Sequence, residues 1–303
     1  MSIFTGSGVA VCTPFDNAGN FNHAVYDKLI DFQVKEGTDA IVACGTTGEA
    51  TTLSKDEHIE IVRHAVLFTK KASEKYNRKV PVIAGAGGND TAKCITMGQV
   101  LSQAGADGLM CVTPYYNKTS QRGLIEHYTA IAKAVDIPIV VYNVPGRTAL
   151  NMLPATLYEI SKIPNIVAMK EASGDIVQVA EMVELCGDAI TMYSGNDNHI
   201  VPMLSLGGKG VITTTGNITP AAIHNMVMEY LNGNHEESLR LQLGILPLVR
   251  CLFADVNPMP IKAALNMMEF EAGNCRLPLT TVDDSLHEKL KCEMVKYGLL
   301  PKH

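Results

Sequence analysis

The chain has 303 residues, of which 47% are hydrophobic and 18% are charged, a balance typical of a globular protein and too apolar for a disordered one. Its formal net charge of -6 comes without a block of basic residues, which argues against a nucleic-acid partner. The first residues lack the pattern of a signal peptide, and no apolar stretch is long enough to cross a bilayer. We therefore expect a cytoplasmic protein with no membrane partner.

The cysteines and histidines show no pattern of a disulfide scaffold or a metal site. The eight cysteines contain no CxxC pair, and disulfide frameworks are typical of small secreted domains. We therefore expect buried free thiols. His58 and His64 are too far apart in the sequence to share one helix face, as a metal-binding pair would. No metal site is predicted.

A repeated pattern of a short apolar run, a polar or glycine-rich turn and a helix-like stretch extends from Gly6 to about Gly216. The apolar runs are 8–12, 40–44, 80–84, 108–112, 137–142, 166–170, 189–193 and 210–213. Runs without alternation are typical of strands buried on both faces, and intervening helices imply parallel βαβ units. This pattern predicts an α/β fold, a (β/α)8 TIM barrel, rather than an open dinucleotide-binding sheet, because Gly85–Asp90 does not complete a GxGxxG motif.

Helix signals fit between the predicted strands and continue after them. Ser54–Glu57 resembles a capping box that begins a helix ending near Ser73, and Asn89–Thr91 begins another. The strand pattern stops after about Leu231. Three helices are predicted beyond it, at 235–254, 260–270 and 283–297. We expect the barrel to span residues 1–231 and a C-terminal helical domain, packed on the barrel or on another subunit, to span 232–303.

Lys170 ends the apolar run 166–170, where an ammonium group is out of place. Burial would lower the pKa of its amine, so that a useful fraction is neutral and nucleophilic near pH 7. Such an amine can attack a ketone and form a Schiff base. The alternative is a lysine whose charged head extends from the strand end into solvent.

The residues that follow the other predicted strands favour a site. Functional residues of a barrel of this type lie at the carboxyl ends of its strands. Thr46 and Thr47 offer hydroxyls and backbone N–H groups for a small carboxylate. Tyr142 could relay protons beside Lys170, and Arg147 offers a planar fork for a second carboxylate. Each could instead be structural, as a turn, a core tyrosine or a surface ion-pair residue, but their convergence at one end of the barrel favours chemistry.

Five motifs together resemble the dihydrodipicolinate synthase family of the pyruvate-dependent class I aldolase and lyase superfamily. They are Gly45–Glu49, Pro114–Asn117, Tyr142–Arg147, Val167–Ala172 and Asn257–Lys262. The resemblance covers nearly the whole chain, from Phe4 to Leu300. It implies a lyase without an organic cofactor, with pyruvate and aspartate semialdehyde as substrates, that assembles as a homotetramer made of two dimers.

The resemblance also implies a role for each residue of the site. Lys170 would form an imine with pyruvate, and the derived enamine would attack L-aspartate 4-semialdehyde to give 4-hydroxy-tetrahydrodipicolinate, the committed step of diaminopimelate and lysine biosynthesis. Thr46, Tyr116 and Tyr142 match a proton relay, in which Tyr116 reaches the site of a neighbouring subunit. The implied substrate-binding positions are Thr47, Gly195 and the backbone of Ile212, with Arg147 holding the semialdehyde carboxylate at the entrance.

Some members of this family bind lysine as a feedback inhibitor at the dimer interface. His58, Asn89 and Tyr115 match that site, but Lys55 and Lys93 stand where sensitive enzymes tend to carry His and Glu. Because like charges at close range disfavour binding of a cationic ligand, we expect weak or no inhibition by L-lysine.

Three other functions compete with this interpretation. An N-acetylneuraminate lyase or a keto-deoxy-sugar-acid aldolase would share the lysine, but Thr46, Arg147 and the Tyr115–Tyr116 pair favour the synthase. A non-catalytic barrel could bind a keto acid as a sensor. A metal-dependent class II aldolase would need histidine and carboxylate ligands at the mouth, and the predicted strand ends supply no histidine.

Overall fold

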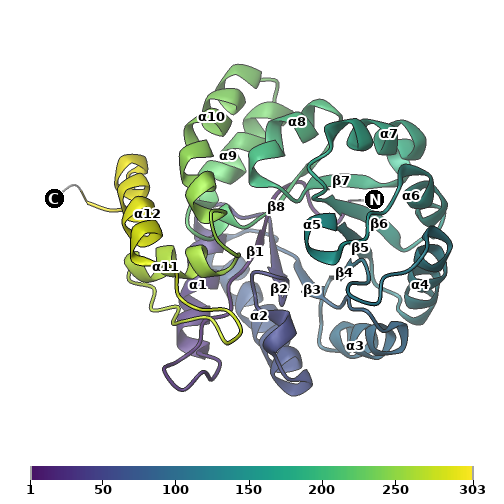
Figure 1. The fold of residues 1–303 in the computed structure, drawn as a ribbon, viewed down its shortest axis with the longest axis horizontal. Coiled ribbons are helices and arrows are strands. Elements are labelled where there is room, and N and C mark those ends of the chain that lie inside the picture. The colour runs from purple at the N-terminus through teal and green to yellow at the C-terminus, as the bar shows by residue number, and fades with distance from the viewer. Residues whose placement is uncertain (1, 302–303) are drawn as a thin grey trace.

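The fold is a closed barrel of parallel strands surrounded by helices (Figure 1), seen in a computed structural model that describes residues 2–301. The strands are β1 (Gly6–Ala10), β2 (Ala40–Ala43), β3 (Val82–Gly85), β4 (Gly108–Val112), β5 (Ile139–Asn143), β6 (Ile166–Glu171), β7 (Thr191–Ser194) and β8 (Gly210–Thr213). They follow one another around the barrel in chain order, and β8 pairs with β1 to close the sheet. The predicted (β/α)8 TIM barrel is confirmed.

Helices cover the outside of the barrel and extend beyond it. They are α1 (His23–Lys35), α2 (Lys55–Tyr76), α3 (Thr91–Gln103), α4 (Gln121–Ala134), α5 (Pro145–Thr148), α6 (Pro154–Ser161), α7 (Ile176–Cys186), α8 (Ile200–Ser205), α9 (Pro220–Leu231), α10 (His235–Leu252), α11 (Met259–Met267) and α12 (Asp284–Tyr297). The predicted capping box is present, because Ser54 and Glu57 bond to each other's backbone N–H groups at the start of α2. Asp90 caps α3 in a similar way, through its side chain alone.

Several strands are shifted from their predicted limits. The run at 80–84 forms a strand only from Val82, and the run at 137–142 only from Ile139. In both cases the strand begins directly after a proline, Pro81 or Pro138, which has no N–H to donate to the ladder. β1 begins at Gly6, two residues earlier than predicted, because Gly6 pairs with Gly210 where β8 closes the barrel.

The core has two layers separated by the sheet. Along β5, Ile139 and Val141 pack against the helices, whereas Val140 and Tyr142 belong to the interior of the barrel. Side chains alternate between the faces of a strand, so Lys170 shares the inward face of β6 with Ala168. The fold therefore places the amine of Lys170 inside the barrel.

The C-terminal helices lie at one side of the barrel, with α11 and α12 near α1 and with α10 beside α9 (Figure 1). Leu290 and Met294 of α12 belong to the same apolar cluster as Leu29 of α1 and Ile223 of α9. The three predicted helices are present. A boundary between separate domains at residue 231 stays a prediction, since this cluster contains side chains from both sides of it.

Two further sequence features can be compared with the structure. All eight cysteines are free, and Cys12, Cys44, Cys94, Cys111 and Cys186 are buried, as expected, whereas Cys292 is exposed. Within residues 2–301, the helices include none whose length and hydropathy would allow it to span a membrane.

Candidate active site

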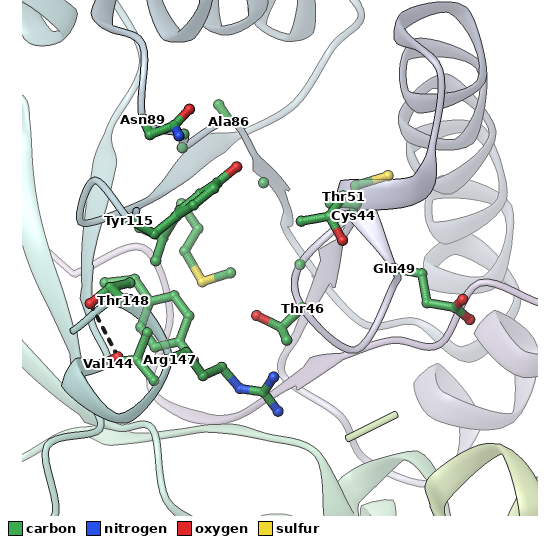
Figure 2. A pocket seen from close by; sticks show the side chains of 18 of the residues that line it. Cys44, Thr46, Glu49, Thr51, Ala86, Asn89, Tyr115, Val144, Arg147 and Thr148 are labelled. Atoms are coloured by element: carbon green, nitrogen blue, oxygen red, sulfur yellow. Dashed lines mark hydrogen bonds between the residues drawn. The ribbon is translucent and has the colours of Figure 1, made fainter. Parts of the chain in front are cut away.

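The carboxyl ends of the strands open into a cavity of about 800 Å³. Thr46, Tyr142 and Arg147 line it, and Tyr115 and Tyr116 stand at its β4 side. Figure 2 shows the side chains of Thr46, Tyr115 and Arg147 projecting toward a common space, the first two from loops and Arg147 from α5. Residues that are far apart in the sequence therefore meet where the barrel rule predicts a site.

Lys170 and Tyr142 are direct neighbours on β6 and β5, where they occupy the same register of the sheet. The Nζ atom of Lys170 lies 4.4 Å from the centre of the Tyr142 ring. Both side chains are buried, with exposed fractions of 5% and 6%. The lysine therefore does not extend into solvent, and its amine lies against the ring of Tyr142, which lines the cavity.

This environment favours the neutral form of the Lys170 amine. Burial lowers its pKa from 10.5 to about 8; the charge of Arg147 lowers it too, while that of Asp197 opposes the change. With such a pKa, roughly a tenth of the amines are neutral at pH 7. An ordinary lysine would have less than about a thousandth in that form, so Lys170 is a far better nucleophile.

The environment of Tyr142 favours the protonated form of its phenol. Burial raises its pKa to about 12, against the opposing effects of the Arg147 charge and a side-chain interaction with Thr46. At neutral pH the phenol therefore keeps its proton. It can act as a proton donor beside Lys170, and Thr46 is the hydroxyl placed to exchange protons with it.

Thr47 lies deeper than Thr46 and is held by neighbouring polar groups. Its Oγ1 lies 3.3 Å from Oγ1 of Thr214 and accepts a hydrogen bond of 2.9 Å from Nδ2 of Asn257. The backbone N–H of Thr214 donates in turn to the buried carboxylate of Asp197. The loops after β2, β7 and β8 are therefore tied together beneath the cavity.

Gly195 and Ile212, like Thr47 and Lys170, are not among the residues that line this cavity. Ile212 is buried in the barrel interior, on β8. The N–H of Gly195 donates to the carbonyl of Glu171 at 2.7 Å, so it is already engaged. A Cβ at this position would lie 2.6 Å from Cβ of Ala172, so the close approach of these two segments of the backbone requires glycine. Roles in substrate binding stay predictions for both residues.

Tyr116 differs from the other members of the proposed relay. Its side chain is 92% exposed, and its φ of 68° is uncommon for a bulky residue. The structure brings Thr46 and Tyr142 together but leaves Tyr116 at the rim of the cavity. A single chain therefore brings together Thr46 and Tyr142 of the proposed relay, but not Tyr116.

Comparison with known proteins agrees with this geometry. The model of the dihydrodipicolinate synthetase family matches residues 3–296. The chain belongs to this family. It is 50% identical over 301 residues to the 4-hydroxy-tetrahydrodipicolinate synthase of Thermoanaerobacter sp. (strain X514), with 99% of each chain covered.

Solved structures of the family have the same fold. The dihydrodipicolinate synthase of Aquifex aeolicus is 37% identical, with a TM-score of 0.93 over 99% of this chain and 100% of the other. A lysine-bound enzyme of this family from Cyanidioschyzon merolae is 38% identical, with a TM-score of 0.94 over the same shares of the two chains. The family resemblance predicted from the motifs is confirmed.

The residues matched to the lysine site of the dihydrodipicolinate synthetase family lie at the outer end of the same cavity. His58, Asn89, Lys93 and Tyr115 line it, and Figure 2 shows Asn89 above Tyr115. Lys55 is not among the lining residues. Burial lowers the pKa of His58, whose Nε2 atom lies 2.8 Å from the carbonyl of Gly85.

Lys262 is a second buried lysine near the site and was not among the predicted site residues. Lys262 pairs with Glu49 at 2.6 Å and also donates to the carbonyl of Asn274. Glu49 directly follows the Thr46–Thr47 loop, so this pair anchors the loop to α11. The sequence did contain a signal of this pair, because each of the motifs 45–49 and 257–262 ends in a charged residue. No group of three His, Cys, Asp or Glu side chains within residues 2–301 is arranged to hold a metal ion.

Proposed function

We propose that this chain condenses pyruvate with L-aspartate 4-semialdehyde through a Schiff base on Lys170, giving 4-hydroxy-tetrahydrodipicolinate. The observation that carries the proposal is the buried Lys170 amine, with a pKa of about 8, held against Tyr142. The name printed for a relative that is 50% identical over the full length supports the same activity. It also favours this synthase over an N-acetylneuraminate lyase or a sugar-acid aldolase.

The first half of the reaction uses Lys170 and Tyr142. The neutral amine attacks the ketone carbon of pyruvate, and a net proton transfer from the nitrogen to the carbonyl oxygen gives a carbinolamine. The nitrogen then expels this oxygen as water, which leaves an iminium ion on Lys170. The protonated phenol of Tyr142, exchanging protons with Thr46, supplies the proton for the leaving oxygen.

The second half joins the two substrates. The iminium loses a proton from the pyruvate methyl group and becomes an enamine, whose carbon attacks the aldehyde. The aldehyde oxygen is protonated to a hydroxyl. The amino group of the semialdehyde then attacks the iminium carbon, which closes a six-membered ring and releases Lys170. Arg147, exposed at the cavity mouth, would hold the semialdehyde carboxylate through its planar fork.

The proposal includes a homotetramer made of two dimers. Tyr116 lines the cavity, and Leu277 directly precedes Pro278, which also lines it. Both side chains are largely exposed, and a second chain could cover them. Val177 of α7 and Leu243 of α10 are also largely exposed. Apolar groups exposed in two places support two contacts between copies of the chain. Its free cysteines support a reducing compartment, and we place the enzyme in the cytoplasm.

An activity assay tests the proposal. The purified protein should consume pyruvate only in the presence of aspartate semialdehyde, and it should not cleave sialic acid. Extensive dialysis against a chelator should leave the rate unchanged, because the mechanism uses no metal or organic cofactor. Lys170→Ala should abolish turnover, and a variant that kept its activity would refute the Schiff-base mechanism. A sensor without catalytic activity would show no turnover in any of these assays.

A further inference from the structure

The proposed mechanism uses no residue of the motif 257–262, yet the first of them, Asn257, contacts the site. Asn257 precedes α11 and is buried at the edge of the cavity. Its side-chain amide donates to Oγ1 of Thr47 at 2.9 Å. Its backbone carbonyl accepts a hydrogen bond of 3.3 Å from Nη2 of Arg147. One residue of the C-terminal segment thus contacts the groups expected to bind the carboxylates of both substrates.

The two contacts come from different parts of Asn257. The contact with Arg147 uses the backbone, so a substitution at 257 leaves its acceptor in place. The contact with Thr47 uses the side chain, so a substitution removes or reverses the donated hydrogen bond. This division predicts that a change of side chain affects the pyruvate end of the site and spares the semialdehyde end.

The direction of the hydrogen bond to Thr47 has a chemical consequence. A hydroxyl has one proton to donate and two lone pairs that accept. Because Thr47 accepts from an amide N–H, its own proton remains available for another acceptor, either a bound carboxylate or Oγ1 of Thr214 at 3.3 Å. A carboxylate is acceptor-only when ionised, so it needs donors around it. Asn257 therefore leaves Thr47 in the state that suits an anionic keto acid.

The loop itself is held by other contacts. Glu49, at its end, pairs with Lys262 at 2.6 Å and accepts a bond of 2.8 Å from the backbone N–H of Arg276. The Thr13 hydroxyl donates to the carbonyl of Gly48 at 2.8 Å. Substitution of Asn257 should therefore change the hydrogen bonding of Thr47 without releasing the loop.

We propose that Asn257 is a positioning residue that directs the proton of Thr47 toward the carboxylate of the keto acid. The inference rests on the proposed function. Asn257→Asp is the sharpest test, because aspartate has almost the same shape but accepts the Thr47 proton. It also places a negative charge beside the substrate carboxylate. Asn257→Ala only removes the donor.

The experiment measures two half-saturation concentrations for each variant. The concentration of pyruvate that gives half-maximal borohydride-trapped adduct should rise roughly tenfold or more in Asn257→Asp, and about threefold in Asn257→Ala. The KM for aspartate semialdehyde should stay within about twofold in both variants, since Arg147 keeps its backbone acceptor. Asn266→Ala is the matched control: it removes two hydrogen bonds to Gly273 in the C-terminal segment and should change neither value.

The outcomes separate this inference from the proposed function. An Asn257→Asp variant with the native pyruvate dependence would overturn the role of Asn257 alone. If that variant does not fold, Asn257→Ala is compared in the native and Thr47→Val backgrounds. The inference requires that it adds no further loss without the Thr47 hydroxyl, and additive losses would overturn it. Failure of the native protein and of Asn266→Ala to form any pyruvate adduct would refute the proposed function itself.

Discussion

The Nζ atom of Lys262 lies 2.6 Å from Oε1 of Glu49, and the two side chains are 2% and 0% exposed. Lys170 is also buried, yet within residues 2–301 no carboxylate lies close enough to form an ion pair with it. Burial alone therefore does not make a lysine nucleophilic. The amine of Lys262 is paired with a buried carboxylate, whereas burial lowers the pKa of the Lys170 amine, which can therefore lose its proton.

The buried pair should be important for stability. Lys262→Met leaves the Glu49 carboxylate buried without its cation, although the backbone N–H of Arg276 still donates to it. We expect the substitution to lower the free energy of unfolding by roughly 3–5 kcal/mol. Combining it with Glu49→Leu should recover much of this loss. Urea unfolding followed by circular dichroism measures both. Lys296→Met, which removes a surface pair with Glu293, is the control and should change stability by less than about 1 kcal/mol. Equal effects of the two lysine variants would contradict a special role for the buried pair.

The rate of imine formation should follow the titration of Lys170. With a pKa of about 8, the initial rate at low pyruvate should rise with pH and level off above roughly pH 8, rather than continue to rise toward 10.5. Asp197 raises this pKa and Arg147 lowers it. Asp197→Asn should therefore move the rising part of the pH–rate curve to lower pH, and Arg147→Leu should move it to higher pH. Rapid borohydride quenching across a pH series gives these curves. If neither variant moves the rising part of this curve, the group that titrates is not Lys170.

The phenol of Tyr142 should contribute to catalysis and little to binding. Tyr142→Phe removes the proton donor, and we expect kcat to fall by about 100-fold or more with a small change in the KM for pyruvate. Tyr128→Phe is the matched control, since Tyr128 is also buried and its hydroxyl donates to the carbonyl of Cys111, outside the site. Steady-state kinetics of both variants decide the matter. A comparable loss in the control would assign the effect to packing.

The contacts between copies of the chain can be tested on α7 and α10. If Val177 and Leu243 lie in the contact between dimers, the double substitution Val177→Asp and Leu243→Glu should dissociate a tetramer into dimers. Sedimentation velocity measures this directly. Leu67→Asp, at an exposed leucine of α2, should leave the tetramer intact. A native protein that sediments as a monomer would refute the proposed assembly.

L-lysine should inhibit this enzyme weakly or not at all. Lys93 lines the cavity at the position expected to face the ligand, where its charge disfavours a second cation. A coupled assay should show little inhibition at millimolar lysine, and Lys93→Glu should increase the inhibition. Half-inhibition of the native enzyme at micromolar lysine would contradict the prediction.

The order of the strands could be predicted from the sequence because each strand is buried on both faces. Such strands are uninterrupted apolar runs, and consecutive runs become neighbours in a barrel. That rule placed Tyr142 beside Lys170, and their shared register agrees with it. The strand limits were less accurate, since a run such as 137–142 does not show that Pro138 delays the start of pairing.

The contacts made by the C-terminal helices could not be predicted. Asn257 is 210 positions from Thr47 in the sequence, and no local periodicity records that the two meet. The pair formed by Glu49 and Lys262 has the same origin, because only the packing of α11 on the barrel brings the charges together. The 92% exposure of Tyr116 likewise could not be predicted from the strand pattern.

The most direct measurement is a map of the covalent adduct. The native protein is incubated with pyruvate, reduced with borohydride and digested, and each lysine-containing peptide is analysed by mass spectrometry. Our account predicts one reduced pyruvate adduct, on Lys170, with Lys262 unmodified, and no adduct in Lys170→Ala. An adduct on Lys262, or an equal adduct in the Lys170→Ala variant, would contradict it.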